Sequence, residues 1–214
     1  MPTENSYKIR TKKRDLFLRV SKGHFATNHS HINYYIDVTT QKTRLSEAKA
    51  VAKALVAYYS HNTVIDTILC LDGTQVIGAM LAEELERGNY ATLNKHETIY
   101  VVTPEHSTGS QLIFRENISS MMIKNKNVLI LSASVTTGYT ASSAVEAIKY
   151  YGGTPVGICA LFATVKCCAG FEVQSVFDPT DLQDYSSHPA PECPMCRAGQ
   201  RIDALVNSFG YSKI

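Results

Sequence analysis

A run of hydroxyl-bearing residues around one glycine is the strongest chemical signal in the sequence. Its members are Ser134, Val135, Thr136, Thr137, Gly138, Tyr139 and Thr140. The run follows an apolar stretch that predicts a buried strand, and it opens a segment with helical spacing. Backbone N–H groups at a helix N-terminus bind anions, threonine hydroxyls add donors, and glycine allows close backbone approach. The pattern favours a monophosphate site over an ordinary βα turn with a threonine cap.

A second turn of this kind lies earlier in the chain. Asp72, Gly73 and Thr74 follow the apolar stretch 63–71 and precede a helical pattern over 75–87. An Asp-Gly turn alone is common and has a purely structural explanation. However, parallel strands end at the same edge of a sheet, so two such turns predict a ligand that carries phosphate at both ends.

Strand-like and helix-like segments alternate around these turns. The expected strands cover residues 63–71, 98–102, 127–131, 156–162 and 173–177, and the expected helices cover 48–59, 75–87 and 140–151, the second closed by Gly88. This order predicts an α/β fold with a mainly parallel sheet and helices on both faces. A mobile loop is expected over 103–117, and a short helix is expected over 200–208 in a proline-rich C-terminal extension.

The overall composition is that of an ordinary globular protein. The 214 residues include 21 basic and 19 acidic side chains, and 44% of them are hydrophobic. A net charge of +2 gives no reason to expect a nucleic-acid binder. The basic run at residues 8–14 is interpreted as a solvated arm or a subunit contact. No leader or membrane span is visible, so a cytoplasmic location is the default expectation.

The cysteines and histidines leave several interpretations open. Cys193 and Cys196 have the spacing of a metal knuckle, which Cys167 and Cys168 could complete as a structural zinc site of four thiolates. A redox pair and inert thiols are the alternatives. Three histidines lie near the N-terminus, either around a ligand or a partner subunit or as packing residues: His24, His29 and His31.

Residues 128–140 resemble the phosphoribosyl pyrophosphate (PRPP) motif of type I phosphoribosyltransferases. The motif has four apolar residues, an acidic pair, two mostly apolar residues and then Thr-Thr-Gly-x-Thr. Among these enzymes the sequence is most similar to orotate phosphoribosyltransferase. Residues 23–37 are similar to that family's opening segment, which helps to form a hood over the base. Residues 71–74 correspond to its pyrophosphate loop and 106–109 to its flexible catalytic loop.

The resemblance implies a role for each matching position, and it also marks departures. Ser134 and residues 136–140 would hold the 5-phosphate, and Asp72, Gly73 and Thr74 would hold pyrophosphate. Ser132 and Ala133 occupy the two acidic positions. His106 is the one cation or proton donor in the loop segment 103–106, where the family has lysines that reach a neighbouring subunit. Lys166 stands where an arginine contacts the carboxylate of orotate.

The implied organisation is a hood segment at 1–40, an α/β core at 41–178 and a C-terminal extension at 179–214. The implied function, within nucleotide metabolism and pyrimidine biosynthesis, is transfer of ribose 5-phosphate from PRPP to a nitrogenous base with release of pyrophosphate. Mg²⁺ would accompany PRPP, and the protein would be a homodimer. The alternative is a catalytically weak or inactive protein that binds PRPP or a nucleotide as a sensor or regulatory subunit.

Overall fold

The computed structural model describes residues 6–10, 16–87, 94, 98–107, 111–207 and 210–214. The chain forms two compact units. The core unit comprises residues 41–176, and the terminal unit comprises residues 1–40 together with 177–214. The two ends of the chain therefore belong to one unit, whereas the sequence treats them as a hood and an extension.

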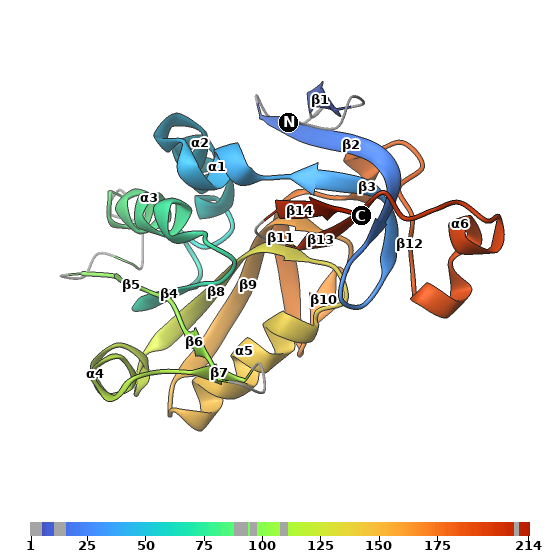
Figure 1. Ribbon diagram of the computed structural model, residues 1–214. Helices are drawn as coiled ribbons and strands as arrows, with labels where there is room; N and C mark the ends of the chain where they lie inside the picture. Colours follow the sequence, from blue (N-terminus) through green and yellow to red (C-terminus); the bar gives the residue numbers. More distant parts are fainter. Residues whose placement is uncertain (1–5, 11–15, 88–93, 95–97, 108–110, 208–209) are drawn as a thin grey trace. The chain divides into compact units, whose positions relative to one another are not determined.

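A six-stranded sheet forms the centre of the core unit, in the order β10-β11-β9-β8-β4-β5 (Figure 1). Its strands are β4 (Thr67–Cys70), β5 (Tyr100–Val102), β8 (Asn127–Val135), β9 (Thr154–Ala163), β10 (Cys167–Cys168) and β11 (Phe171–Phe177). The pairs β5–β4, β4–β8 and β8–β9 are parallel, and β10–β11 is antiparallel. The predicted, mainly parallel α/β sheet is confirmed.

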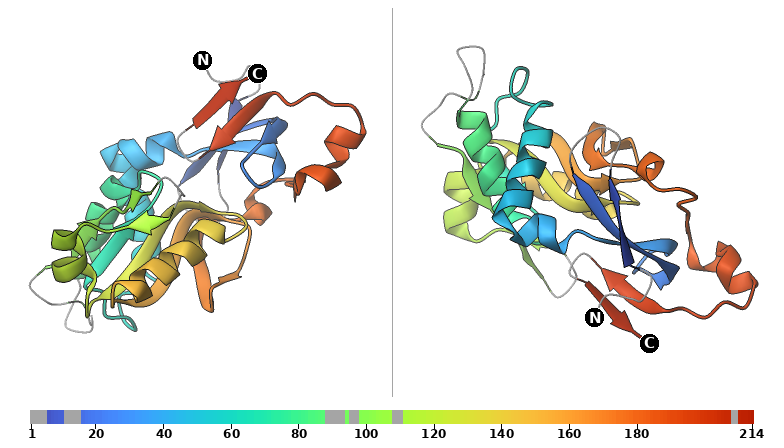
Figure 2. Two further views of the ribbon diagram at one scale, coloured as in Figure 1. Left: turned by 60° about the horizontal axis from the view of Figure 1, so that its bottom comes forward. Right: turned by 90° about the horizontal axis from the view of Figure 1, so that it is seen from above.

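Helices cover both faces of this sheet, as the two sets of views show (Figures 1 and 2). The core unit contains α2 (Leu45–Val56), α3 (Gln75–Glu86), α4 (Glu116–Ile118), α5 (Tyr139–Tyr150) and the π-helical turn η1 (Ser119–Ile123), and α1 (Thr39–Thr43) leads into it. Leu69 and Ile130 share a buried cluster with α5. On the opposite pleat, Ile68 and Cys70 face Gly78 of α3. Strands buried on both faces explain the continuous apolar runs in the sequence.

The expected mobile loop contains a small hairpin. Strand β6 (Glu105–His106) pairs antiparallel with β7 (Leu112–Ile113). Arg115 donates two hydrogen bonds to the Glu105 carboxylate, at 2.6 and 2.9 Å, across the base of this hairpin. The loop residues Thr108, Gly109 and Ser110 lie outside the described residues, as does Gly88.

The terminal unit has a sheet of its own, in the order β12-β3-β2-β13-β14, with β1 also paired to β2. Its elements are β1 (Ser6–Arg10), β2 (Phe17–Ala26), β3 (His31–Asp37), β12 (Ser187–His188), β13 (Ala204–Asn207), β14 (Gly210–Lys213), α6 (Pro194–Arg197), η2 (Pro179–Asp181) and η3 (Ala190–Glu192). The first part of the basic run, residues 8–10, lies in β1, and residues 11–14 lie outside the described part of the chain.

The helix expected over 200–208 is wrong. Residues 204–207 form strand β13, which pairs in parallel with β2 and antiparallel with β14, the red hairpin in Figure 2. Ala204 and Val206 are buried whereas Leu205 is 54% exposed, so the burial has the period of two that strands require. The segment is too short to form a stable helix by itself, so pairing with β2 determines its conformation. The short helix in this region is α6, four residues long.

Among the described residues, no helix combines the length and the apolar character needed to cross a membrane.

Gly78 allows α3 to approach β4 closely, which gives a stability prediction. A Cβ at this position would collide with the Cys70 sulfur and lie 3.1 Å from Val101 Cγ1. We expect Gly78→Ala to lower the free energy of unfolding by about 1–3 kcal/mol, measured by urea denaturation, because overpacking outweighs the gain in helix propensity.

Ala79→Gly, at the exposed neighbouring position, serves as the control for helix propensity. Adding Cys70→Ala to Gly78→Ala should recover part of the loss, because it removes the sulfur that the new methyl group meets. A Gly78→Ala protein more stable than the wild type would contradict the packing argument.

Candidate functional site

The two predicted turns lie at the same edge of the core sheet because their strands are adjacent and parallel. In the β4–β8 pair, Cys70 is opposite Leu131. One residue further, the Leu71 N–H donates to the Leu131 carbonyl at 2.8 Å. Strand β4 ends there, whereas β8 continues beside β9 as far as Val135. Residues 72–74 therefore begin beside Ser132 and Ala133 of β8.

The hydroxyl-rich loop 134–140 turns into α5 through a left-handed glycine. Gly138 has φ +79° and is the N-cap residue of α5. The side chains of Thr137 and Thr140 are exposed, and the Thr164 hydroxyl donates to the Thr136 carbonyl at 2.7 Å. The first turn of a helix leaves backbone N–H groups without intrahelical acceptors. This loop therefore presents amide and hydroxyl donors together, as an anion site requires.

Cys168 packs directly beneath this glycine. Its Sγ lies 3.2 Å from the Gly138 carbonyl and 3.3 Å from the Ser142 hydroxyl. A Cβ at position 138 would lie 2.8 Å from the same sulfur. Glycine is thus required here both by its positive φ and by the closeness of β10, and Cys168 is a packing partner of the loop.

The loop 72–74 is held in an unusual conformation. Asp72 and Gly73 have φ of 56° and 78°, both in the left-handed region. The fully buried Thr74 hydroxyl contacts the Leu71 carbonyl at 2.8 Å and the Leu131 carbonyl at 3.2 Å. The loop is therefore fixed to the ends of both strands before α3 begins.

The carboxylate of Asp72 contacts two residues of the neighbouring strand β8. Asp72 Oδ2 accepts from the Ser132 hydroxyl at 2.6 Å and from the Ala133 N–H at 3.3 Å. Ser132 is itself 1% exposed. Ser132 and Ala133 occupy the two motif positions without an acid. A carboxylate is nevertheless hydrogen-bonded to both of them, and it comes from Asp72, which follows β4.

Lys42 supplies a positive charge that the sequence analysis missed. Its ammonium group donates to the Asp72 carbonyl at 2.9 Å, and the side chain is 6% exposed. No motif surrounds Lys42 in the sequence, so its position beside the loop follows only from the fold.

The two remaining predicted contacts lie on the surface of the core unit. Lys166 is exposed in the turn after β9, and His106 is exposed on the β6–β7 hairpin. Among the hydrogen bonds that the structure describes, none joins the Lys166 or His106 side chain to residues 72–74 or 134–140.

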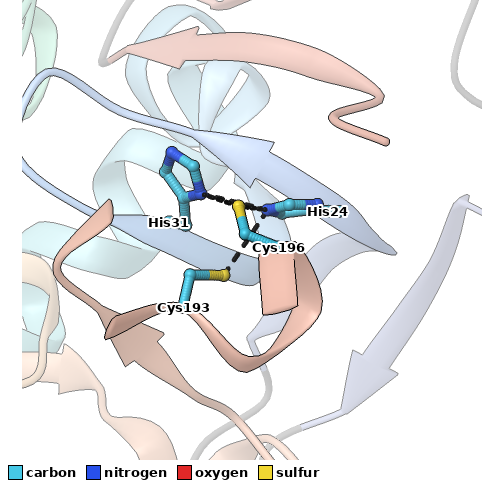
Figure 3. Close-up of side chains that lie close together, drawn as sticks. All are labelled: His24, His31, Cys193 and Cys196. Carbon is cyan, nitrogen blue, oxygen red and sulfur yellow. Dashed lines mark hydrogen bonds between the residues drawn. The ribbon is translucent and has the colours of Figure 1, made fainter. Parts of the chain in front are cut away.

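The cysteines divide into three groups. Burial raises the pKa of Cys70 to about 12 and also raises that of Cys159, so both thiols stay protonated in the core. Cys167 and Cys168 lie on β10 of the core unit. Cys193 and Cys196 lie in the terminal unit, where they meet His24 and His31 rather than further cysteines (Figure 3). His29 is exposed on the turn between β2 and β3 and is not part of that group.

Comparison with known proteins identifies the fold. No protein-family model matches the chain, and no curated protein matches it either. Among solved structures, it is similar to the UMP synthase of Leishmania donovani, with 19% identity and a TM-score of 0.56 over 76% of this chain and 34% of that one. The chain therefore spans about a third of the length of that enzyme.

Two shorter enzymes give similar matches. Orotate phosphoribosyltransferase of Mycobacterium tuberculosis H37Rv is 15% identical, with a TM-score of 0.50 over 82% of this chain and 89% of that one. Adenine phosphoribosyltransferase of Trypanosoma brucei, in complex with AMP, pyrophosphate and ribose 5-phosphate, is 15% identical, with a TM-score of 0.50 over 84% and 78%. The chain has the type I phosphoribosyltransferase fold, related to that of the orotate enzymes.

The buried hydroxyl of Thr74 leads to a prediction about the loop it holds. Thr74→Val keeps the shape of the side chain and removes its hydrogen bonds to two carbonyls, so we expect the free energy of unfolding to fall by about 1 kcal/mol. Thr140→Val, at an exposed position, should change it by less than about 0.5 kcal/mol. Equal effects in urea denaturation would show that the Thr74 contacts do not hold the loop.

Proposed function

We propose that this protein is a phosphoribosyltransferase of the orotate type, which transfers ribose 5-phosphate from PRPP to a nitrogenous base in pyrimidine nucleotide synthesis. A ring nitrogen of the base would attack C1 of the ribose. The bond from C1 to the pyrophosphate oxygen would break, with the electron pair leaving on pyrophosphate, and the base would lose its proton. The observation that carries the proposal is that loop 134–140 lies next to the Asp72 carboxylate, which is hydrogen-bonded to Ser132 and Ala133.

Loop 134–140 supports binding of the 5-phosphate. Its hydroxyls at Ser134, Thr137 and Thr140 are exposed, and its backbone is held from beneath by Cys168 and from the side by Thr164. A preformed set of donors at a helix N-terminus binds a phosphate without reorganisation. We assign the monophosphate end of PRPP to this loop.

Asp72 supports the chemical step. The bond-breaking step gives the ribose an oxocarbenium-like positive charge, which a nearby carboxylate stabilises. In the PRPP motif two acids hold the ribose hydroxyls, and here those positions are Ser132 and Ala133. The Asp72 carboxylate, 2.6 Å from the Ser132 hydroxyl, is placed to take over part of that role.

The charge on pyrophosphate requires cations at the same edge of the sheet. Lys42, hydrogen-bonded to the Asp72 carbonyl, provides one. Mg²⁺ prefers oxygen ligands, and the carboxylate of Asp72 fits that preference. When bound with PRPP, Mg²⁺ would neutralise part of the pyrophosphate charge.

The β6–β7 hairpin completes the proposal. His106 is exposed on this hairpin and is assigned as a cation that approaches pyrophosphate when the loop closes and excludes water. Lys166 is assigned to the base. A homodimer agrees with the resemblance, in which this loop serves a neighbouring subunit.

A non-catalytic binder of PRPP or a nucleotide is the second candidate. The replacement of both motif acids by Ser132 and Ala133 favours it, since the phosphate loop is kept while charge is lost from the motif itself. Such a protein would act as a sensor or a regulatory subunit.

Binding and turnover measured side by side separate the two functions. With PRPP, Mg²⁺ and a panel of pyrimidine and purine bases, we expect PRPP binding by calorimetry and pyrophosphate release with at least one base. PRPP binding without pyrophosphate release on any base would favour the sensor. A gain of turnover in the double variant Ser132→Glu with Ala133→Asp would then identify the missing motif acids as the cause of inactivity. Absence of PRPP binding would contradict both functions.

A change at Asp72 tests the source of the carboxylate. Asp72→Asn keeps a residue that tolerates a positive φ and removes the charge, so we expect kcat to fall by about 10²–10³-fold, as for the loss of one preorganised electrostatic group. PRPP affinity should fall by a smaller factor, because Asp72 is also assigned to Mg²⁺ while loop 134–140 still holds the 5-phosphate.

Asp66→Asn is the matched control, because Asp66 lies at the opposite end of β4 and accepts the Asn127 N–H. Its effect should be confined to stability. If Asp72→Asn and Asp66→Asn had the same kcat as the wild type, Asp72 would have no part in the chemical step.

A further inference from the structure

Four metal-binding side chains converge in the terminal unit, apart from the residues of the proposed function (Figure 3). His24 comes from β2 and His31 from the start of β3, two strands joined by a short turn. Cys193 precedes α6, and Cys196 lies within it. The four donor atoms all lie within 4.8 Å of one another. Two histidines and two cysteines are a ligand set typical of zinc.

Four of the distances between these atoms are close to the edges of a zinc tetrahedron, and the two made by His31 Nδ1 are shorter than the ideal values. With Zn–S of about 2.3 Å and Zn–N of about 2.0–2.1 Å, tetrahedral ligands lie about 3.6 Å apart for N···S and about 3.4 Å apart for N···N. The structure has 3.6 Å from His24 Nε2 to each of the two sulfurs. It has 3.2 Å from His31 Nδ1 to Cys196 Sγ and 3.1 Å from His31 Nδ1 to His24 Nε2.

The surroundings of His24 fix its orientation. His24 is fully buried, and its Nδ1 lies 3.0 Å from the Gln200 carbonyl, to which it donates. The proton is therefore on Nδ1, and the lone pair of Nε2 points toward the two thiols. A hydrogen bond to the second ring nitrogen is the usual support of a metal-bound histidine. Asp203 holds the same residue, because its carboxylate accepts the His24 N–H and its own N–H donates to the His24 carbonyl, both at 2.7 Å.

The segment around the cysteines has almost no apolar core. Between residues 189 and 203, Cys193 is the one side chain that is buried, and the others are exposed or half-buried. A four-residue helix is too short to be stable by itself. Small segments without a core are usually fixed by a disulfide or a metal. The fold of this segment therefore needs a cross-link to the β2–β3 hairpin.

A disulfide between Cys193 and Cys196 would not supply that cross-link. It would join two residues of the same short segment and leave both histidine nitrogens facing each other at 3.1 Å. A divalent metal uses all four donors, joins the segment to β2 and β3, and balances the charge of two thiolates, of which the Cys193 thiolate is buried.

We propose that His24 Nε2, His31 Nδ1, Cys193 Sγ and Cys196 Sγ form a structural zinc site that fastens residues 189–203 to the β2–β3 hairpin. All four tetrahedral positions are filled by protein atoms, so the metal stabilises the fold and does no chemistry. The knuckle spacing of Cys193 and Cys196 predicted half of this site. His24 and His31 complete it in place of the expected Cys167 and Cys168.

Metal analysis of the full chain tests the site. We expect one zinc per chain after purification without a histidine tag under reducing conditions. Reconstitution with Co²⁺ should give the visible bands of a tetrahedral site and a thiolate-to-metal charge-transfer band. Cys193→Ser, Cys196→Ser, His24→Gln and His31→Gln should each weaken zinc binding by more than about 100-fold, because each removes one of the four ligands. Cys167→Ser and His29→Gln are the matched controls and should retain one zinc.

Thiol labelling of the wild type provides a readout that does not depend on variants folding. Zinc should protect Cys193 and Cys196 from alkylation and leave the exposed Cys167 reactive. Chelation should expose residues 189–203 to proteolysis. The proposal is overturned by a reduced chain that binds neither zinc nor Co²⁺ stoichiometrically, by a Co²⁺ spectrum without thiolate bands, or by a Cys193–Cys196 disulfide in protein alkylated at lysis.

Discussion

The parallel pairing of β4 with β8 is the constraint on which the proposed site depends. Because Cys70 and Leu131 are opposite each other, β4 ends beside the middle of β8, and the Leu71 N–H still bonds to the Leu131 carbonyl. The Thr74 hydroxyl then contacts carbonyls from both strand ends. A slip of this register would separate Asp72 from Ser132, and loop 134–140 would lose the carboxylate that is hydrogen-bonded just before it. The backbone hydrogen bonds between β4 and β8 thus determine where the negative charge of Asp72 lies.

The sequence predicts the parallel sheet well because its strands are buried on both faces and bounded by glycine and proline. The turn from β8 into α5 at residues 134–140 was also predictable, since it is one continuous segment that opens a helix; its phosphate binding stays a prediction. The contacts of Asp72 with Ser132 and of Lys42 with the Asp72 carbonyl were not, because each joins residues far apart in the chain. The strand β13 was misjudged for the same reason, as it owes its conformation to β2.

The proposed metal ligands also show that contacts between residues distant in sequence are hard to predict. Two cysteines three residues apart are a local signal, and the sequence analysis recognised it. Their histidine partners are 162 to 172 residues away along the chain, so proximity in sequence pointed to Cys167 and Cys168 instead. The antiparallel pairing of β2 with β3 brings His24 and His31 together, and the bond from Nδ1 of His24 to the Gln200 carbonyl turns the ring toward the cysteines. Half of such a site is visible in sequence, and the fold supplies the other half.

Under the proposed function, the location of Asp72 compensates for the absence of acids at both motif positions. Asp72 has a φ of 56°, where aspartate, asparagine and glycine are tolerated better than other residues. Among these three, only aspartate carries a charge, so one residue satisfies both the backbone of the loop and the electrostatics of the site. Glycine would keep the turn and lose the hydrogen bonds to Ser132 and Ala133. A carboxylate held by two donors from the neighbouring strand β8 is already oriented before any ligand binds. In the proposed function, a preorganised charge of this kind would stabilise the developing cation.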